Sequence, residues 1–236
     1  MRISVTLSAN AGVVIDFAGH RVWVDALHDQ KVNGFSAVSI DLQEQMMKSS
    51  AFSNPECICY THCHPDHFSQ ELTASAKALW PEAALYLPEQ VFPEQILVQG
   101  QSASYREGEL NLHFVRLPHE GAQYAGCIHY GILLSLAGKN VLIPGDCQVA
   151  ADALAQAVKD IPIDLALLNF PWLTLKKGHT FFREVLRPKK TLLYHLPFAE
   201  DDTNGFRQAA EKSLIRENVG EVQLLWNPLQ TIVLDI

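Results

Sequence analysis

The chain has 236 residues, of which 48% are hydrophobic and 19% charged, and its formal net charge is −8. This globular balance excludes an intrinsically disordered chain, and the length allows one large domain or two small ones. The acidity, without a run of Lys or Arg, disfavours nucleic acid as a partner, and no apolar stretch approaches the length of a membrane span.

The apolar spacing of the first half predicts strands and helices in alternation. In order, we expect strands over residues 2–7, 13–17 and 21–25, a helix over 37–49, a strand over 56–60 and a helix starting at a Ser69 cap and stopped by Pro81. The order strand, ligand loop, helix is typical of a site at the carboxyl ends of strands, where the sheet holds the ligands in place.

The second half repeats this order of elements. We expect a strand over 110–117, a hairpin over 128–136 and 141–143, a helix over 149–158, a strand over 164–169, a loop with Pro171, Trp172 and Gly178, a helix over 180–186, a strand over 191–194, a helix over 203–217 and strands over 222–226 and 231–234. No linker separates the halves, so residues 1–236 are predicted to form a single domain.

The run Thr61-His62-Cys63-His64-Pro65-Asp66-His67 places three imidazoles and a carboxylate in six consecutive positions. Zinc, iron and manganese accept these ligands. Imidazoles two positions apart in an extended stretch point to the same side, so His62 and His64 can bind one ion. A turn after them aims Asp66 and His67 at a second point, which favours two neighbouring ions. The alternative is a His-rich surface loop.

Three later predicted strands each end on one possible ligand, namely His119, Asp146 and His195. Taken singly, each histidine fits a hydrogen-bonded surface residue, and Asp146 fits a turn residue that caps the next helix. Together with the His-rich run they complete a two-ion set, which consists of a tris-imidazole site, a second site and a bridging carboxylate.

The order of these residues resembles the metallo-β-lactamase superfamily of metallohydrolases. The matching series covers nearly the whole chain: Asp25, His62-x-His64-x-Asp66-His67, His119, Asp146 and His195. The resemblance implies an α+β fold, a four-layer αββα sandwich with the metals in a groove where two sheets meet at one edge.

The resemblance also implies a role for each residue of the series. His62, His64 and His119 would bind one ion, Asp66, His67 and His195 the other, with Asp146 between the two ions. Asp25 would orient the loop by hydrogen bonds and bind no ion, although it also fits a cap after a strand.

Within the superfamily, the short chain and the ending Tyr194-His195-Leu196-Pro197-Phe198 are most similar to the small hydrolases grouped with ascorbate-6-phosphate lactonase. Two segments depart from family patterns. Leu-Pro-His-Glu-Gly surrounds His119 in place of the Pro-Gly-His-Thr of glyoxalase II, and residues 8–12 only loosely resemble the Gly-His-Ser-Gly-type opening. The resemblance therefore leaves the substrate open.

The expected chemistry is hydrolysis with two divalent ions as cofactors, zinc first and manganese or iron as alternatives. The ions would share a water and supply hydroxide at neutral pH, which attacks a small ester, lactone, amide or phosphoester. Asp66 is the candidate catalytic residue, because it can orient the nucleophile and carry its proton besides ligating. Tyr124, Tyr194, His129 and His179 could assist, although packing or ordinary pairing is the favoured explanation for each.

Three rival functions predict different sequence features. A di-iron redox enzyme would place Glu at the position of His64 and carry a flavin domain. A phosphodiesterase or nuclease of the same superfamily would add a large insertion or a basic arm, and this acidic chain has neither. A non-catalytic metal-binding member would have no need of a complete ligand set.

The expected partner is a small-molecule substrate, with the oligomeric state open.

The cysteines and the N-terminus predict a cytoplasmic protein. The five cysteines form no C-x-x-C pair (Cys57, Cys59, Cys63, Cys127 and Cys147). An odd number without a framework favours reduced thiols. Residues 1–7 alternate like a strand and lack the apolar core of a signal peptide.

Overall fold

The structure, a computed structural model, describes residues 1–217 and 221–236. These residues group into two compact units, each of which holds one mixed sheet. Unit 1 comprises residues 1–98, 195–204 and 225–235, and unit 2 comprises residues 99–194, residue 236 and the described part of 205–224. The prediction of a single domain stays a prediction. None of the described helices has the length and apolar character needed to cross a membrane.

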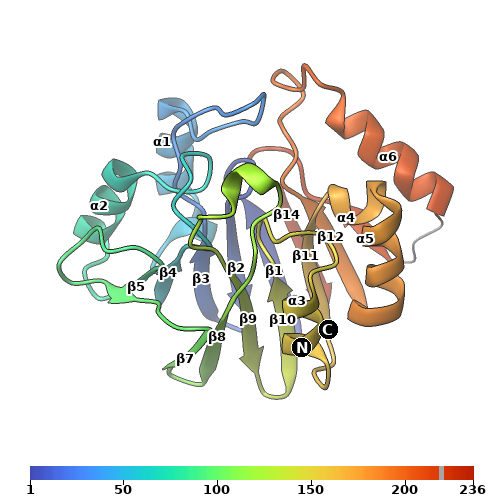
Figure 1. Cartoon of the computed structure of the whole chain (residues 1–236). Helices are drawn as coiled ribbons and strands as arrows, with labels where there is room; N and C mark the ends of the chain where they lie inside the picture. Colours follow the sequence, from blue (N-terminus) through green and yellow to red (C-terminus); the bar gives the residue numbers. More distant parts are fainter. Residues whose placement is uncertain (218–220) are drawn as a thin grey trace. The chain divides into compact units, whose positions relative to one another are not determined.

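Unit 1 contains a sheet with the strand order β14-β1-β2-β3-β4-β5-β6 (Figure 1). Its strands are β1 (Arg2–Leu7), β2 (Val13–Phe17), β3 (His20–Val24), β4 (Cys57–Cys59), β5 (Ala84–Leu87), β6 (Ile96–Leu97) and β14 (Thr231–Asp235). Its helices are α1 (Ile40–Lys48), the 3-10 turn η1 (Ser50–Phe52) and α2 (Gln70–Leu79).

The position of the His-rich run follows from strand direction in this sheet. β1, β2 and β3 pair antiparallel, whereas β3, β4, β5 and β6 pair parallel. Because the carboxyl ends of parallel neighbours meet at the same edge, Asp25 after β3 lies beside Thr61 after β4. The backbone N–H of Asp25 donates to the carbonyl oxygen of Cys59 at 3.0 Å, which joins the two strand ends.

Unit 2 contains a sheet with the strand order β13-β12-β11-β10-β9-β8-β7. Its strands are β7 (Ser102–Glu107), β8 (Leu110–Arg116), β9 (Tyr130–Leu136), β10 (Lys139–Ile143), β11 (Leu165–Asn169), β12 (Lys190–Tyr194) and β13 (Val222–Leu224). Its helices are η2 (Ala122–Tyr124), α3 (Asp152–Val158), α4 (Pro171–Thr174), α5 (Lys176–Phe181), the π-helical turn η3 (Phe182–Leu186) and α6 (Phe206–Glu217).

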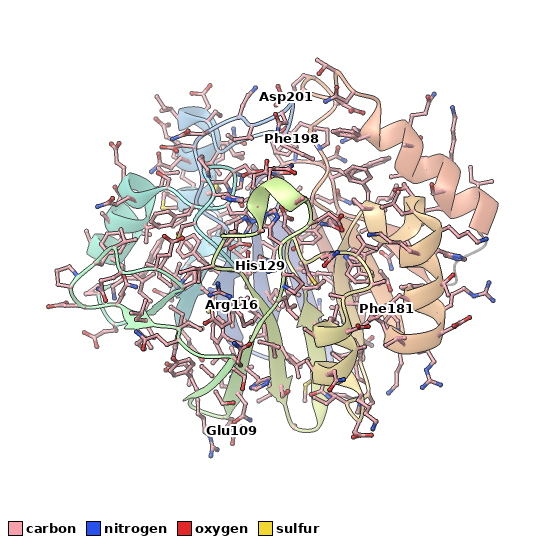
Figure 2. The ribbon with its side chains drawn as sticks, in the orientation of Figure 1. Glu109, Arg116, His129, Phe181, Phe198 and Asp201 are labelled. Carbon is pink, nitrogen blue, oxygen red and sulfur yellow. The ribbon has the colours of Figure 1, made fainter. Side chains whose placement is uncertain are left out.

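Strand direction also brings two predicted ligands of unit 2 to one edge. β8 and β10 both pair antiparallel with β9, so they run in the same direction and their carboxyl ends share an edge. His119 follows β8 and Asp146 follows β10. An isolated antiparallel bridge pairs His119 with Cys147 and fixes the two segments side by side. Arg116, the last residue of β8, is labelled in Figure 2.

The predicted strands over residues 2–7 and 13–17 are confirmed with their bounds. The third lies at His20–Val24 and not at 21–25, because Asp25 leaves the extended region with φ +50°. The strand predicted over 56–60 is the shorter β4, and the helix predicted over 37–49 is α1, which begins after the Ser39 cap.

Several predicted bounds in unit 2 were wrong for a local backbone reason. α3 begins at Asp152 and not at residue 149, because Ala150 has φ +64°. α6 begins at Phe206 and not at residue 203, after Gly205 with φ +71°. The loop predicted around Pro171 forms α4 and α5, and the helix predicted over 180–186 belongs to the end of α5 and to η3. The strands β8, β9, β11 and β13 are each shorter than predicted.

Candidate metal centre

Asp25 organises the His-rich run of unit 1. Its side chain is fully buried and accepts the backbone N–H of Thr61 at 2.7 Å, the Thr61 hydroxyl at 2.6 Å and Nδ1–H of His67 at 3.0 Å. The predicted orienting hydrogen bonds of Asp25 are therefore confirmed. A carboxylate on the far nitrogen of a histidine fixes its tautomer and ring orientation, which leaves Nε2 of His67 as the atom that can bind a cation.

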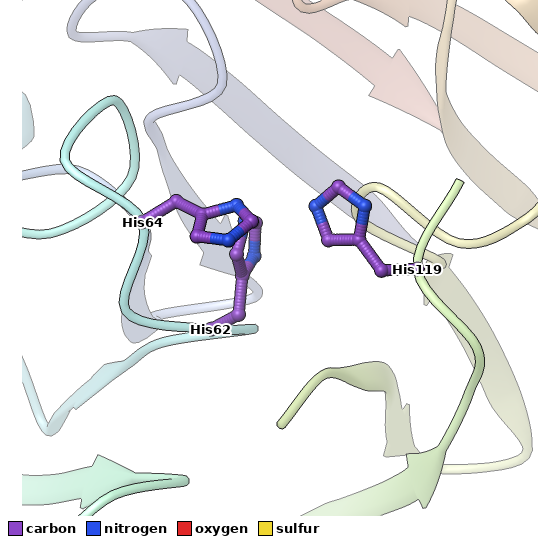
Figure 3. Close-up of side chains that lie close together, drawn as sticks. All are labelled: His62, His64 and His119. Carbon is purple, nitrogen blue, oxygen red and sulfur yellow. The ribbon is translucent and has the colours of Figure 1, made fainter. Parts of the chain in front are cut away.

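The Thr61 hydroxyl extends this control to His62. Its single hydrogen goes to Asp25, so at its 3.0 Å contact with Nδ1 of His62 the hydroxyl oxygen accepts. Nδ1 of His62 therefore carries the proton, and Nε2 is again the available ligand atom. The rings of His62 and His64 project from the same loop, with centroids 4.5 Å apart (Figure 3).

Asp66, His67 and His195 form a compact ligand group inside unit 1. One ligand atom from each of the three side chains lies within 4.8 Å of the other two, and all three residues are buried. His195 has φ +56°, which ends the extended run of β12, and its ring stacks on Phe35 with centroids 4.7 Å apart. Two imidazoles and a carboxylate in this arrangement fit a zinc, iron or manganese ion.

His28 belongs to the same surroundings, although sequence reasoning missed it. It is fully buried, and its Nδ1–H donates to the carbonyl oxygen of Asp25 at 3.0 Å. Burial, followed by the neighbouring His67, lowers the pKa of His28 to about 4, so its ring is neutral at pH 7. The spacing Asp25-x-x-His28 after a strand end was the available sequence signal.

In unit 2, His119 and Asp146 lie next to each other. Nε2 of His119 is 3.7 Å from Oδ2 of Asp146, and Nδ1–H of His119 donates to the carbonyl oxygen of Glu120 at 2.8 Å. As with His62 and His67, the tautomer leaves Nε2 to bind a cation. Asn169 Nδ2 donates to the other oxygen of Asp146 at 3.5 Å, and burial raises the pKa of the neighbouring Cys147 thiol.

The four residues for which packing or ordinary pairing was the favoured explanation differ in their surroundings. Tyr124 places its ring 4.7 Å from that of His119. His129 is fully buried, and its Nδ1–H donates to the carbonyl oxygen of Leu117 at 3.3 Å. Tyr194 is buried in β12, and His179 lies in α5. Burial of Tyr194 fits the packing explanation, and the ring centroid of His129 lies 5.6 Å from that of His119.

Comparison with known proteins shows what this architecture resembles. No family model and no curated protein matches the sequence. Among solved structures, a possible metal-dependent hydrolase from Veillonella parvula has a TM-score of 0.70 at 17% identity, covering 97% of this chain and 98% of that one. The metallo-β-lactamase fold protein YhfI from Bacillus subtilis has a TM-score of 0.67 at 13% identity, with both chains covered completely.

A third similar structure is CmlA, a diiron β-hydroxylase from Streptomyces venezuelae, with a TM-score of 0.65 at 11% identity; the match covers 99% of this chain and 54% of that one. Several similar structures are named metal-dependent hydrolases. At these identities the likeness concerns the fold. The chain has an α+β fold of the metallo-β-lactamase type, as predicted.

Proposed function

We propose that the protein is a metal-dependent hydrolase that uses two divalent ions. His62, His64 and His119 would hold one ion, and Asp66, His67 and His195 would hold the other. Asp146 would serve as a ligand shared by the two ions.

The observation that carries this proposal is the common orientation of three imidazoles. In His62, His67 and His119, Nδ1–H is engaged by a hydroxyl, a carboxylate or a carbonyl oxygen, so Nε2 is left with a lone pair in each. Histidines that bind metals in proteins have this arrangement, whereas surface histidines have no need of it. The compact group Asp66, His67 and His195 supports the second ion.

When bound, two divalent ions lower the pKa of a coordinated water and polarise the oxygen of a carbonyl or phosphoryl substrate. The chain's own residues do the remaining work. Asp66 orients the nucleophilic water and takes up its proton. Asp25 and Thr61 keep His62 and His67 in the tautomers that bind cations. Tyr124, whose ring lies 4.7 Å from that of His119, is the residue we propose as proton donor to the leaving group.

The substrate class we propose is a small ester, lactone, amide or phosphoester. The resemblance of residues 194–198 to lactonase-like hydrolases makes lactones the first compounds to assay. Nitrogen and oxygen ligands accept zinc, manganese and iron alike, so all three ions require testing. A cytoplasmic location remains part of this proposal.

The test combines metal analysis with an activity screen. We expect about two equivalents of transition metal per chain and hydrolysis of at least one lactone, ester or phosphodiester. Replacing the shared ligand, Asp146→Ala, should remove at least one equivalent and nearly all activity while the chain stays folded. Asp160→Ala, which changes an exposed carboxylate in the same unit, is the matched control and should behave like the wild type.

Less than half an equivalent after loading with zinc, manganese or iron would refute the proposed centre. Full metal content without hydrolysis of any compound would instead favour a non-catalytic metal-binding protein. Cleavage of oligonucleotides in preference to small esters would favour the phosphodiesterase or nuclease alternative.

A further inference from the structure

Arg116 breaks the apolar pattern on the core-facing side of β8. Leu110, Leu112 and Phe114 occupy alternate positions of the strand and are fully buried. Arg116 is the next residue in this series, so its side chain starts from the same face. In the register it stands opposite Tyr130, the buried first residue of β9, and the Arg116 guanidinium lies 5.5 Å from the Tyr130 ring centroid.

The positive charge of Arg116 has no carboxylate partner within residues 1–217 and 221–236. Its Nη2 donates only a long hydrogen bond, 3.4 Å, to the carbonyl oxygen of Cys127. The side chain is partly buried, and a charge withdrawn from water without a counter-charge is costly. An anion supplied from outside would offset that cost.

Glu120, which follows Arg116 by four residues in the chain, has a carboxylate that is already engaged by other groups. Its Oε2 accepts the backbone N–H of Val149 at 2.6 Å and lies 3.7 Å from Nζ of Lys177. These contacts direct the Glu120 carboxylate toward Val149 and Lys177 and partly neutralise it. Glu120 therefore does not compete with a ligand for the guanidinium of Arg116.

Arg116 and His119 line one cavity of unit 2, about 540 Å³ in volume. Gln101 and Gln148 contribute amide groups to its walls, and the rest of the lining includes apolar residues such as Leu117 and Pro118. The volume is within the range that holds a small molecule. A ligand that binds the guanidinium there lies beside His119, one of the metal ligands of the proposed function.

We propose that the substrate carries an anionic group, a carboxylate or a phosphate, which Arg116 binds through its guanidinium while the scissile bond lies toward His119. This inference rests on the proposed hydrolytic function. Arg116 is then a specificity-determining residue of the site, and its planar fork matches the two oxygens of such a group.

The kinetic test compares two esters with the same leaving group, p-nitrophenyl acetate and the p-nitrophenyl monoester of glutaric acid. Arg116→Gln should lower kcat/KM for the anionic ester by about tenfold or more and leave the neutral ester nearly unchanged. Arg116→Lys keeps the charge and loses the fork, so it should recover part of the preference. Arg106→Gln, which changes an exposed arginine of β7, is the matched control, and this variant should keep the full preference for the anionic ester.

A second measurement is independent of hydrolysis. Succinate and inorganic phosphate are titrated calorimetrically into the wild type, Arg116→Gln and Asp146→Ala, and the tighter ligand identifies the carboxylate or the phosphate. Binding that survives Asp146→Ala and is lost in Arg116→Gln supports the proposal even if no ester is cleaved. Binding lost only in Asp146→Ala would assign the anion to the metal ions and overturn it.

Two further results would overturn the proposal as well. One is an equal loss of kcat/KM for both esters in Arg116→Gln, provided that the variant unfolds at the wild-type temperature. The other is no binding of either anion by the wild type up to about 10 mM, which corresponds to an interaction too weak for specific recognition. If Arg116→Gln does not fold, Arg116→Lys is compared with the wild type instead, and the expected loss for the anionic ester is smaller because the charge is kept.

Discussion

Asp25 acts on the candidate centre through hydrogen bonds to Thr61 and His67, which lie 36 and 42 positions further along the chain. It fixes His67 directly and His62 through the Thr61 hydroxyl. One buried carboxylate therefore determines which nitrogen two histidines present. Its own geometry depends on the φ of +50°, which turns the chain at the end of β3.

His28 provides a pH-dependent prediction at the residue scale. Its folded pKa of about 4 lies below its unfolded value of 6.5, so the unfolded chain binds more protons between these values and stability falls as the pH drops. At pH 5 the expected loss is about 2 kcal/mol relative to pH 7.5. In urea unfolding of the chelator-treated protein, His28→Asn should reduce the difference between pH 7.5 and pH 5 by about that amount.

The amide of the Asn variant can still donate a hydrogen bond, so the comparison isolates titration from the loss of that donor. His20→Asn, which changes a partly exposed histidine at the start of β3, is the control. An unchanged pH dependence in His28→Asn would show that folding does not lower the pKa of His28.

At the scale of elements, α2 contacts the residue that leads into the His-rich run. The helix begins directly after the run, and the Tyr60 hydroxyl lies 2.5 Å from Oγ1 of Thr73, a buried residue of α2. The Ser69 hydroxyl accepts the backbone N–H of Leu72 at 3.3 Å and donates to Asp29 at 3.0 Å. Ser69 is the N-cap predicted from the sequence, and the structure confirms it.

Ser69→Ala removes this cap and should lower the free energy of unfolding by about 1 kcal/mol, measured by urea denaturation. Ser75→Ala, an exposed change inside the same helix, should leave stability equal or slightly higher, because Ala has the better helix propensity. Equal effects of the two substitutions would mean that the hydroxyl of Ser69 contributes nothing as a cap.

The strands β5 and β7 were not predicted from the sequence, and the physical reason is similar for both. β5 is a short run with three buried residues, Leu85 to Leu87, and such a run lacks the alternation that distinguishes a strand. β7, with the sequence Ser-Ala-Ser-Tyr-Arg-Glu, is a polar edge strand with no fully buried position. Both are specified by pairing with their neighbours, which local patterns do not contain.

For the whole molecule, the ligands named in the proposed function belong to both units, so loading with metal is expected to stabilise each of the two sheets. Binding at 100 times the dissociation constant adds about 2.7 kcal/mol per site. Chelation with dipicolinate should therefore lower the melting temperature and, in hydrogen exchange read by mass spectrometry, reduce protection of peptides from both β4 and β10.

Asp146→Ala, which affects the proposed shared ligand, should show the reduced protection in both sheets before chelation. Asp160→Ala should respond like the wild type. Protection lost from β4 and retained at β10 would mean that His119 and Asp146 hold no ion.

The types and order of the candidate ligands were determined by the sequence alone, because ligand chemistry belongs to the side chain and strand ends follow from local patterns. The fold class followed from the family resemblance that this series of residues carries. Only the tertiary structure decided which imidazole nitrogens are available, that His28 joins the group, and that the charge of Arg116 has no carboxylate partner among the residues that the structure describes. These features depend on contacts between residues far apart in the chain, and strand direction and register, not local sequence, bring such residues together.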